Sequence, residues 1–264
     1  SNSNFFILGC IIEKLTKKSY DENLQNRIVK KAELGTYESK TEMTAKGAVT
    51  NKVFVPTTYY KEEAINTANK ESYSYYFDGT NWVKSLENHN SIPFASGGIT
   101  STPADLTKFI HALFNGKLVN ASSLEQMKEI KEGYGKALIQ FPFGERRFYG
   151  HGGKIEEFSS MLGYYPTEKL SFSLISNGNN FEQNDIIIGI LSIYYKMPFP
   201  FPKFMKMDKA ELAKFTGTYA SKELPIKIMV SEKNGELFAQ ATGQSAFPLT
   251  FKEERTFVFA PAGI

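Results

Sequence analysis

The sequence predicts an α+β fold, because segments with helical periodicity precede a run of consecutive strands that a further helix closes. Three observations carry this prediction: an apolar helix over residues 5–15, a well-delimited helix that starts at Thr102, and four strands between residues 136 and 177. A smaller all-β domain is predicted after residue 207. The length of 264 residues, with 41% hydrophobic and 22% charged residues, suits one sizeable core and a small appendage.

The first helix is predicted from an apolar set that is wide enough to encircle a buried helix. Its members are Phe5, Phe6, Ile7, Leu8, Ile11, Ile12 and Leu15. Ser and Asn at positions 1–4 are natural N-caps, so the helix is expected to begin there. The single cysteine of the chain, Cys10, lies within this helix and is expected to be a small buried hydrophobe.

A polar helix is predicted over residues 20–34, and the pattern becomes irregular from residue 37 to residue 90. That region is rich in Thr, Asn and Tyr, which suits loops that cover an active site. Within it, residues 53–56 and 73–77 are predicted to be short strands, with Asp78-Gly79 as the turn after the second strand.

The best-delimited helix follows the pair Gly97-Gly98 and begins at Thr102, which is expected to cap it. Pro103 suits the first helical position, and Asp105 lies near the positive end of the helix dipole. Apolar residues then recur on one helical face up to the stop at Gly116, namely Leu106, Phe109, Ile110, Leu113 and Phe114.

A helix over residues 123–131, with Ser122 and Glu125 as a capping box, leads into the strands. Consecutive antiparallel strands are predicted over residues 136–141, 148–151, 158–165 and 170–177, the last two joined by a turn over residues 166–169. A closing helix over residues 184–195 is expected to pack against this sheet.

Three prolines at alternate positions predict a semi-rigid linker over residues 197–207, because each proline removes a backbone donor and favours extended chain. The predicted domains are therefore residues 1–196 and residues 208–264. The second domain is expected to be a β-meander, with strands over residues 212–219, 226–230, 237–239 and 256–260 and a hairpin turn at Lys233-Asn234-Gly235.

The most informative chemistry lies in Gly150-His151-Gly152-Gly153-Lys154, which places a histidine beside glycines at a strand. Because Gly152 and Gly153 lack a Cβ, a substrate carbonyl could approach the backbone there and accept hydrogen bonds from N–H groups, as in an oxyanion hole. The alternative is a turn at the start of a strand, in which His151 merely satisfies a backbone carbonyl.

Three segments, in this order, resemble motifs of the serine β-lactamase and penicillin-binding-protein superfamily, in its class C β-lactamase, D-alanyl-D-alanine carboxypeptidase and esterase branch. Ser1-Asn2 resembles the end of the family's Tyr-x-Asn motif, residues 97–106 resemble its Gly-Gly-Ile-x-Ser-Thr-x-x-Asp-Leu stretch, and His151-Gly152-Gly153 resembles its Lys/His-Thr/Ser/Gly-Gly triplet. The resemblance runs to about residue 195 and implies a β-lactamase/transpeptidase-like antiparallel sheet with helices, whose N-terminal part is missing. Gly217-Thr218-Tyr219 similarly resembles the start of the lipocalin-like β domain that such hydrolases often carry, here expected to be incomplete.

The nucleophile motif of this family, Ser-x-x-Lys, is absent, since no serine in the sequence has a lysine three residues later. A serine hydroxyl is a poor nucleophile until a neighbouring base removes its proton, which is why the family pairs it with a lysine one helical turn away. In the family this motif lies upstream of Tyr-x-Asn. The chain is therefore expected to be the C-terminal portion of a longer hydrolase and to be inactive alone.

The resemblance implies acyl transfer from an amide or ester through an acyl-enzyme. Asn2 would bind the substrate's amide side chain or hold the catalytic lysine, His151 would bind a carboxylate or assist proton transfer, and the N–H of Lys154 would be one oxyanion donor. Gly152 and Gly153 would line the substrate, with Gly152 standing where many relatives carry a hydroxyl. Carboxypeptidase, esterase and β-lactamase activities stay open, and so does a non-catalytic receptor for peptides or peptidoglycan.

Other classes of function have little support in the sequence. The net charge is +3 and the basic residues are scattered, so no nucleic-acid partner is predicted. His89, His111 and His151 lack ligand spacing, so no metal or other cofactor is expected. No apolar run reaches the roughly 18 residues of a membrane span. The expected partners are a small-molecule, peptide or peptidoglycan-like substrate and the missing N-terminal segment, in the periplasm, at the cell surface or secreted.

Overall fold

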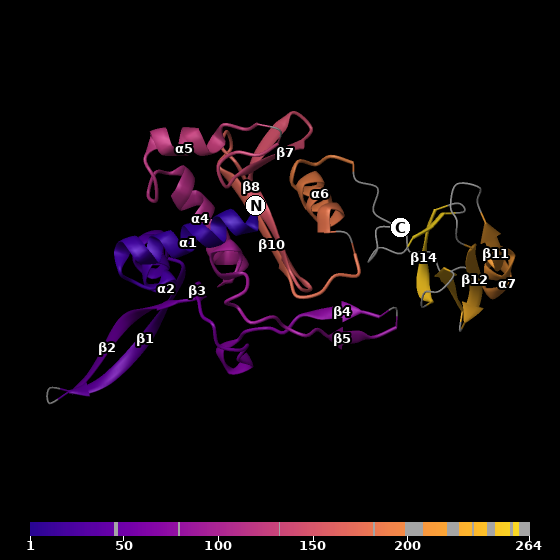
Figure 1. Cartoon of the computed structure of the whole chain (residues 1–264), viewed down its shortest axis with the longest axis horizontal. Helices are drawn as coiled ribbons and strands as arrows, with labels where there is room; N and C mark the ends of the chain where they lie inside the picture. The colour runs from indigo at the N-terminus through magenta and orange to yellow at the C-terminus, as the bar shows by residue number, and fades with distance from the viewer. Residues whose placement is uncertain are drawn as a thin grey trace. The chain divides into compact units, whose positions relative to one another are not determined.

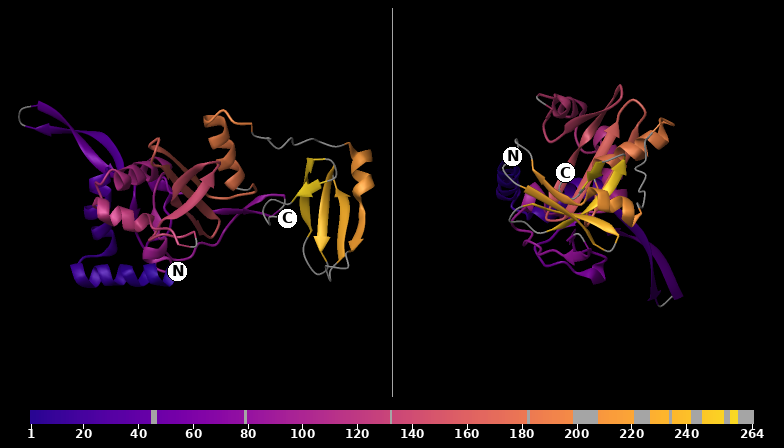
Figure 2. Two further views of the ribbon diagram at one scale, coloured as in Figure 1. Left: turned by 90° about the horizontal axis from the view of Figure 1, so that it is seen from above. Right: turned by 90° about the vertical axis from the view of Figure 1, so that its right-hand side faces the viewer.

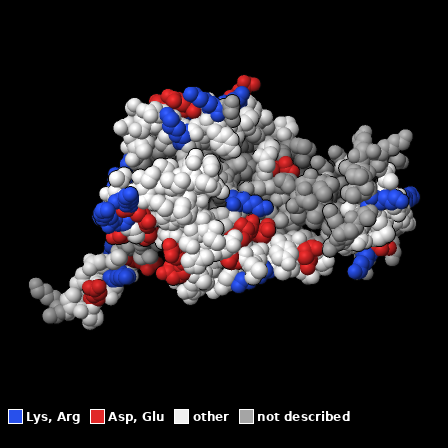
Figure 3. All heavy atoms as spheres, viewed as in Figure 1, with Lys and Arg blue, Asp and Glu red and all other residues white. Residues whose placement is uncertain are grey.

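The computed structural model describes residues 1–44, 47–78, 80–131, 133–181, 183–198, 208–220, 227–233, 235–241, 246–253 and 256–258. The chain forms two compact units, Ser1–Ser74 with Leu86–Asn177, and Tyr75–Ser85 with Gly178–Ile264 (Figure 1). Most of the predicted linker lies outside the described residues, so the domain boundary at residues 197–207 stays a prediction. On the face shown in Figure 3, basic and acidic side chains are interspersed.

The first unit opens with helix α1 (Asn2–Thr16), which the sequence predicted, but this helix is not buried. Gly9 is its one buried residue, whereas Leu15 is 78% exposed. Cys10 is exposed too. The expected burial of the apolar set and of Cys10 is therefore wrong, because the described residues leave most of the helix surface open to solvent.

One side of α1 does find a partner, the 3₁₀ turn η3 (Phe94–Ser96). The rings of Phe6 and Phe94 meet edge to face at a centroid distance of 5.2 Å. A Cβ on Gly9 would lie only 2.4 Å from the Cβ of Ala95, so glycine is what allows the helix and the turn to approach so closely.

The predicted polar helix over residues 20–34 consists of three successive pieces: α2 (Tyr20–Leu24), the π-helix η1 (Gln25–Val29) and α3 (Lys30–Ala32). Ser19 and Glu22 form a capping box at its start. Buried side chains of all three pieces join a first core cluster with Tyr60 and Phe94, namely Leu24, Val29 and Ala32.

The prediction of irregular loops over residues 37–90 is wrong for residues 37–56, whereas most of the described remainder has only short elements joined by loops. Strands β1 (Gly35–Thr44) and β2 (Gly47–Pro56) form a long antiparallel hairpin. Figures 1 and 2 show that it projects away from the rest of its unit. Nearly every residue of both strands is exposed, so the hydrophobic alternation that reveals a half-buried strand is missing. The predicted strand at residues 53–56 is only the end of β2.

Short elements connect the hairpin to the next helix. Strand β3 (Tyr59–Tyr60) pairs with β6 (Ile99–Thr100), and the turn η2 (Thr67–Asn69) lies between them in the chain. Because β6 directly follows Gly97-Gly98, this pairing ties the glycine segment to the end of the hairpin.

The helix predicted to start at Thr102 is α4 (Pro103–Phe114). Thr102 Oγ1 accepts a hydrogen bond from the N–H of Asp105 at 3.2 Å, which confirms the predicted cap. Ile110 and Leu113 are buried in a second core cluster.

Helix α5 (Ala121–Lys128) begins two residues earlier than the predicted helix over residues 123–131. Asn120 caps it, because its Oδ1 accepts the N–H of Ser123 at 2.8 Å. The predicted capping box of Ser122 and Glu125 is therefore wrong; asparagine is an equally strong cap and precedes it.

The four predicted antiparallel strands are confirmed. They are β7 (Ile139–Phe143), β8 (Arg146–Ile155), β9 (Phe158–Tyr165) and β10 (Leu170–Ser176), in the order β10-β9-β8-β7. Helix α4 packs on β9 and β10, so its buried face and the sheet share the second core cluster. Strand β8 is longer than predicted and includes the whole His151–Ile155 segment.

The second unit contains the hairpin of β4 (Tyr75–Phe77) and β5 (Trp82–Lys84), helix α6 (Gln183–Tyr194), and a helical turn formed by α7 (Lys209–Leu212) and η4 (Ala213–Phe215). Helix α6 confirms the predicted closing helix as an element. The short strand predicted over residues 73–77 is confirmed as β4, and Asp78 accepts hydrogen bonds from the N–H groups of Thr80 and Asn81 after it. Gly79 lies outside the described residues.

The rest of this unit is an antiparallel meander of β11 (Gly217–Ala220), β12 (Lys227–Lys233), β13 (Glu236–Ala241), β14 (Phe247–Glu253) and β15 (Thr256–Val258). The start of the strand predicted over residues 212–219 is wrong, because Leu212 is buried in a helical turn and its N–H donates to the carbonyl of Asp208. Ile226, Asn234 and residues 259–260 of the predicted meander lie outside the described residues.

Candidate active site on strand β8

His151, Gly152, Gly153 and Lys154 lie on the part of β8 that has a strand on one side only. Strand β7 pairs with β8 from Arg146 to Gly150 and then ends. Strand β9 continues along the other side as far as Ile155. Among the described strands, none pairs with residues 151–155 on the β7 side, so this half of β8 is an open sheet edge.

The turns at both ends of β8 show which backbone groups face the open edge. Phe143 pairs with Arg146, and Ile155 with Phe158, across loops of two residues. The residues that flank such a loop form a hydrogen-bonded pair, and successive residues point their N–H and C=O groups to opposite sides. Counting from either turn, the groups of Gly152 and Lys154 point to the open edge. The predicted oxyanion donor, the N–H of Lys154, therefore faces outward.

The glycines of β8 differ in how much space their surroundings would leave for a side chain. A Cβ on Gly150 would lie 1.8 Å from the carbonyl oxygen of Leu162, so the sheet itself requires glycine there. A Cβ on Gly152 would find its nearest neighbours at 3.6 Å, an ordinary contact distance. At Gly153 it would approach the hydroxyl of Ser160 at 2.8 Å, and this hydroxyl can rotate away. Packing therefore accounts for Gly150 and leaves Gly152 without a packing reason.

His151 is exposed, and its ring makes one hydrogen bond among the described residues, between Nδ1 and the carbonyl oxygen of Gly152 at 2.5 Å. A carbonyl only accepts, so Nδ1 is the donor in this bond and Nε2 is left for another partner. This bond is the one that the purely structural interpretation expects. The turn that this interpretation places at His151 is wrong, because His151 lies inside strand β8 and the turn comes only after Ile155. The bond to Gly152 holds the ring beside the open edge, and Nε2 makes no hydrogen bond within the described residues.

The segment of Gly97-Gly98 lies next to the end of β8. A Cβ on Gly97 would come within 2.8 Å of the Ile155 side chain, and the Asn88 amide donates a hydrogen bond to the carboxylate of Glu156. Since η3, directly before Gly97, also contacts α1, the three segments of the family resemblance are linked by consecutive contacts. Asn2 is exposed in the first turn of α1, and no hydrogen bond or ion pair of the described residues joins it to β8.

A buried carboxylate fixes the loop that carries Gly97-Gly98. The Glu71 side chain, 5% exposed, accepts hydrogen bonds from Lys61 Nζ at 2.7 Å and Tyr59 Oη at 2.6 Å. Burial opposes ionisation of Glu71, but these bonds and one from the N–H of Asn66 outweigh it and lower its pKa. The backbone carbonyl of Lys61 in turn accepts a hydrogen bond from the side-chain amide of Asn90.

Two tyrosines of β3 have raised pKa values. Burial raises the pKa of Tyr59 well above its usual range, and the carboxylate of Glu71 adds to the effect. Burial, followed by the charge of Glu62, raises the pKa of Tyr60 to about 12. Both phenols therefore stay protonated near neutral pH and act as hydrogen-bond donors.

Two serine–histidine pairs escaped the sequence analysis, because their members lie on different elements or in an irregular loop. Ser171 Oγ lies 3.0 Å from Nε2 of His111, and Ser91 Oγ lies 2.8 Å from Nδ1 of His89. Among the described residues, no carboxylate hydrogen-bonds either ring. A base without such an orienting partner lacks one part of a triad.

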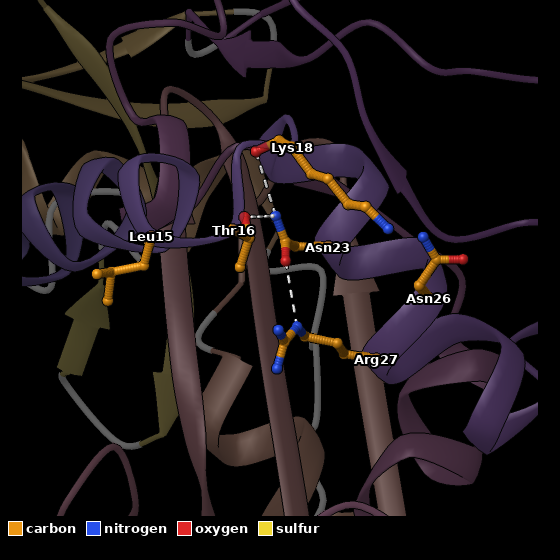
Figure 4. Close-up of a pocket in the computed structure, with 6 residues that line it drawn as sticks. All are labelled: Leu15, Thr16, Lys18, Asn23, Asn26 and Arg27. Atoms are coloured by element: carbon orange, nitrogen blue, oxygen red, sulfur yellow. Dashed lines mark hydrogen bonds between the residues drawn. The ribbon is translucent and has the colours of Figure 1, made fainter.

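A polar pocket of about 450 Å³ lies where α1 meets α2 (Figure 4). Buried Asn23 donates to the Thr16 hydroxyl and accepts from Nε of Arg27. Leu15, Lys18 and Asn26 complete the lining. None of the predicted site residues lines this pocket, so it is separate from the β8 edge.

The described residues contain no group of three or more His, Cys, Asp or Glu side chains that could hold a metal ion. They also contain no helix that is both long and apolar enough to cross a bilayer.

The Beta-lactamase family model matches residues 1–191, and the chain belongs to this family. A solved structure of the D-amino acid amidase from Ochrobactrum anthropi SV3, complexed with L-phenylalanine amide, is 22% identical, with a TM-score of 0.58 over 74% of this chain and 57% of the amidase. A D-stereospecific amidohydrolase from Streptomyces sp. is 25% identical, with a TM-score of 0.50 over 67% of this chain and 49% of that protein.

The octameric penicillin-binding protein homologue from Pyrococcus abyssi is 18% identical, with a TM-score of 0.51 over 96% of this chain and 58% of that chain. The chain thus spans only about half to three fifths of the length of these solved relatives. The predicted family and the α+β fold with an antiparallel sheet are confirmed. The roles of Asn2, His151, Gly152, Gly153 and Lys154 stay predictions.

Proposed function

We propose that this chain is the substrate-facing portion of a serine hydrolase that cleaves an amide or ester through an acyl-enzyme. The observation that carries this proposal is the open edge of β8, where the backbone groups of Gly152 and Lys154 point outward. An extended substrate can add to such an edge as a further strand and take main-chain hydrogen bonds from it. The absence of any packing reason for glycine at position 152 supports close approach of a substrate there.

In this proposal a Ser-x-x-Lys segment upstream of Ser1 supplies the nucleophile and its base. The serine oxygen attacks the substrate carbonyl, its proton passes to the base, and the leaving group departs with a proton. Water then releases the acyl group and restores the serine. The N–H of Lys154 stabilises the oxyanion that forms in both steps, and His151 Nε2 binds a protonated group or accepts a proton beside it.

The relatives guide the choice of substrate. Two of the solved structures are named as enzymes that act on D-amino acid amides or D-configured substrates. We therefore take a D-amino acid amide as the first substrate to test, with its L-enantiomer and a matching ester as comparisons. A periplasmic, cell-surface or secreted location follows the same family analogy.

Intact-mass spectrometry after treatment with a fluorophosphonate or a penicillin tests the proposal. We expect no adduct on the 264-residue chain, and an adduct on the serine of Ser-x-x-Lys in the longer parent polypeptide. The matched control is Ser171→Ala, which removes one of the two alternative serine–histidine pairs and leaves the expected labelling unchanged. Labelling of the chain alone, or an unlabelled parent that carries the motif, contradicts the proposal.

The competing hypothesis is a non-catalytic receptor that uses the same strand edge to bind a peptide or peptidoglycan. The same experiment separates the two hypotheses. A non-catalytic receptor lacks the nucleophile, so it forms no covalent adduct with the fluorophosphonate or the penicillin. A parent polypeptide without any Ser-x-x-Lys motif favours the receptor.

A further inference from the structure

The β1–β2 hairpin is a two-stranded ribbon with two free edges. Each strand is ten residues long, and among the described strands each pairs only with the other. Figures 1 and 2 show the ribbon extending away from its unit in different views. A hairpin without further strands is marginally stable in water, and an unpaired edge is a template for another strand. An additional strand at one of these edges would therefore stabilise the ribbon.

The pairing pattern fixes which backbone groups each edge offers. Thr44 pairs with Gly47 across a two-residue loop, so these two form the first hydrogen-bonded pair and every second pair follows. Thr41 and Thr50 then form a non-hydrogen-bonded pair, and their hydroxyl oxygens lie 2.8 Å apart, as the closer side chains of such a pair allow. On β2 the outward-facing backbone groups are those of Ala48, Thr50, Lys52 and Phe54.

The edges of β1 and β2 differ in charge. Strand β1 carries Glu38, Lys40 and Glu42, and charged side chains are a common protection of free edges. Strand β2 carries only Lys52, together with the exposed valines Val49 and Val53. The β2 edge is thus the one that accepts another strand.

The β2 sequence is also complementary to itself. Asn51 is the midpoint of residues 47–55, and Val49 and Val53 lie two positions to either side of it. When two β2 strands run antiparallel with their Asn51 residues opposite each other, Val49 faces Val53 and Lys52 faces Thr50. This register places apolar residues opposite each other and sets no like charges directly opposite. A two-fold arrangement of this kind is the commonest way in which identical chains associate.

We propose that β2 is a self-association edge, at which a second copy of this chain pairs β2 against β2 about a two-fold axis at Asn51. The product is a continuous four-stranded sheet, β1-β2-β2-β1. Its centre holds the valines of both copies, and the charged residues of β1 lie along its outer edges. The outward N–H and C=O groups of Thr50 and Lys52 form the central hydrogen bonds.

A pair of proline variants tests this proposal with the full 264-residue chain. Ser39 and Lys52 lie opposite each other in the ribbon, and both point their backbone groups outward, one at each edge. Lys52→Pro removes an outward N–H from β2, and Ser39→Pro does the same on β1; proline is tolerated at free edges. In sedimentation velocity over a range of concentrations, we expect the wild type and Ser39→Pro to dimerise and Lys52→Pro to remain a monomer. Circular dichroism establishes that both variants are folded.

Disulfide trapping reads the register directly. In a Cys10→Ser background, Asn51→Cys places two cysteines across a non-hydrogen-bonded pair, whose Cα separation of about 4.5 Å suits a disulfide. Lys40→Cys, directly opposite Asn51 in the ribbon, is the matched control on the β1 edge. We expect the Asn51→Cys dimer to form at least about tenfold faster, since only that pair meets the geometric requirement. Three outcomes would overturn the proposal. The wild type could be monomeric at all concentrations, or the dimer could survive Lys52→Pro through the exposed side chains of α1. The third outcome is equal cross-linking of the two cysteine variants.

Discussion

Helices α1 and α4 are both rich in large apolar residues, yet these residues are exposed in α1 and buried or half-buried in α4. In α4, Ile110 is 1% exposed and Leu113 is 3% exposed, and both belong to a core cluster that includes the sheet. In α1, Ile7 is 55% exposed and Leu15 is 78% exposed. An apolar pattern therefore specifies which face a helix can bury, whereas burial itself requires a partner surface.

The partner of α4 lies within this chain, because the helix is followed by the strands on which it packs. The described partners of α1 are η3 and α2, which cover only part of it. In the proposed hydrolase, the open side of α1 is available to the segment that carries Ser-x-x-Lys. Substitutions in the two helices should therefore differ in their cost to the free energy of unfolding.

The largest effect is expected in the core of α4. Ile110→Ala removes buried methyl groups beside Leu162 and leaves a cavity, so we expect a loss of about 2–5 kcal/mol in the free energy of unfolding. Urea unfolding followed by circular dichroism measures this loss. A change below about 0.5 kcal/mol, the range of ordinary surface substitutions, would show that α4 is not packed as described.

A comparable loss is expected at the start of α4. Asp105 is 1% exposed, and its Oδ2 accepts hydrogen bonds from the hydroxyls of Thr57 at 2.5 Å and Thr58 at 2.8 Å. Asp105→Ala leaves both hydroxyls without this acceptor, so the free energy of unfolding should fall by about 3 kcal/mol. Glu125→Ala, which breaks an exposed ion pair with Lys128, is the control and should change it by less than about 1 kcal/mol.

The ion pair and hydrogen bonds of Glu71 should make a pH-dependent contribution to stability. The folded pKa of Glu71 is lowered from the ordinary value of 4.5, so its stabilising contribution is present above that value and is lost as the pH falls through the folded pKa. We expect Glu71→Gln to be less stable than the wild type at pH 7, and the gap to narrow below about pH 4. Thermal unfolding at a series of pH values measures the gap. A gap that stays constant down to pH 3 would rule out an ionised Glu71 as its source.

The smallest effect on stability is expected on the open side of α1. Leu15→Lys replaces an apolar side chain that is already in solvent, so the free energy of unfolding should stay within about 0.5 kcal/mol of the wild type. Binding of a hydrophobic dye should decrease, because exposed apolar area is lost. A loss of several kcal/mol would mean that Leu15 is buried in this chain after all.

Local signals predicted the elements that they encode directly. Thr102, Pro103 and Gly116 mark α4 within the sequence, and the structure confirms each of these positions. The hairpin of β1 and β2 was missed because pairing between the two strands, rather than burial of one face, holds it together, so no hydrophobic alternation marks it in the sequence. The burial of α1 was predicted wrongly because it depends on residues that the pattern of the helix does not contain.

The residues of the candidate site were chosen from the sequence and their roles stay predictions, whereas the geometry around them depends on neighbouring strands. The glycines beside His151 are visible in the sequence, whereas the open edge depends on where β7 ends relative to β8. Sequence also gave no distinction between Gly150, which the sheet requires, and Gly152, which it does not. Both facts follow from strand register, which is a property of paired strands.

The most direct test of the proposed open edge of β8 compares Lys154→Pro with Lys154→Ala in the parent polypeptide. Lys154→Pro removes the outward N–H and spares the hydrogen bonds to β9, whereas Lys154→Ala removes the side chain and keeps the N–H. If this N–H is an oxyanion donor, acylation by the fluorophosphonate or penicillin probe should be about 10²- to 10³-fold slower in Lys154→Pro and nearly unchanged in Lys154→Ala. Equal acylation rates in the two variants would contradict the assignment of this edge to the oxyanion.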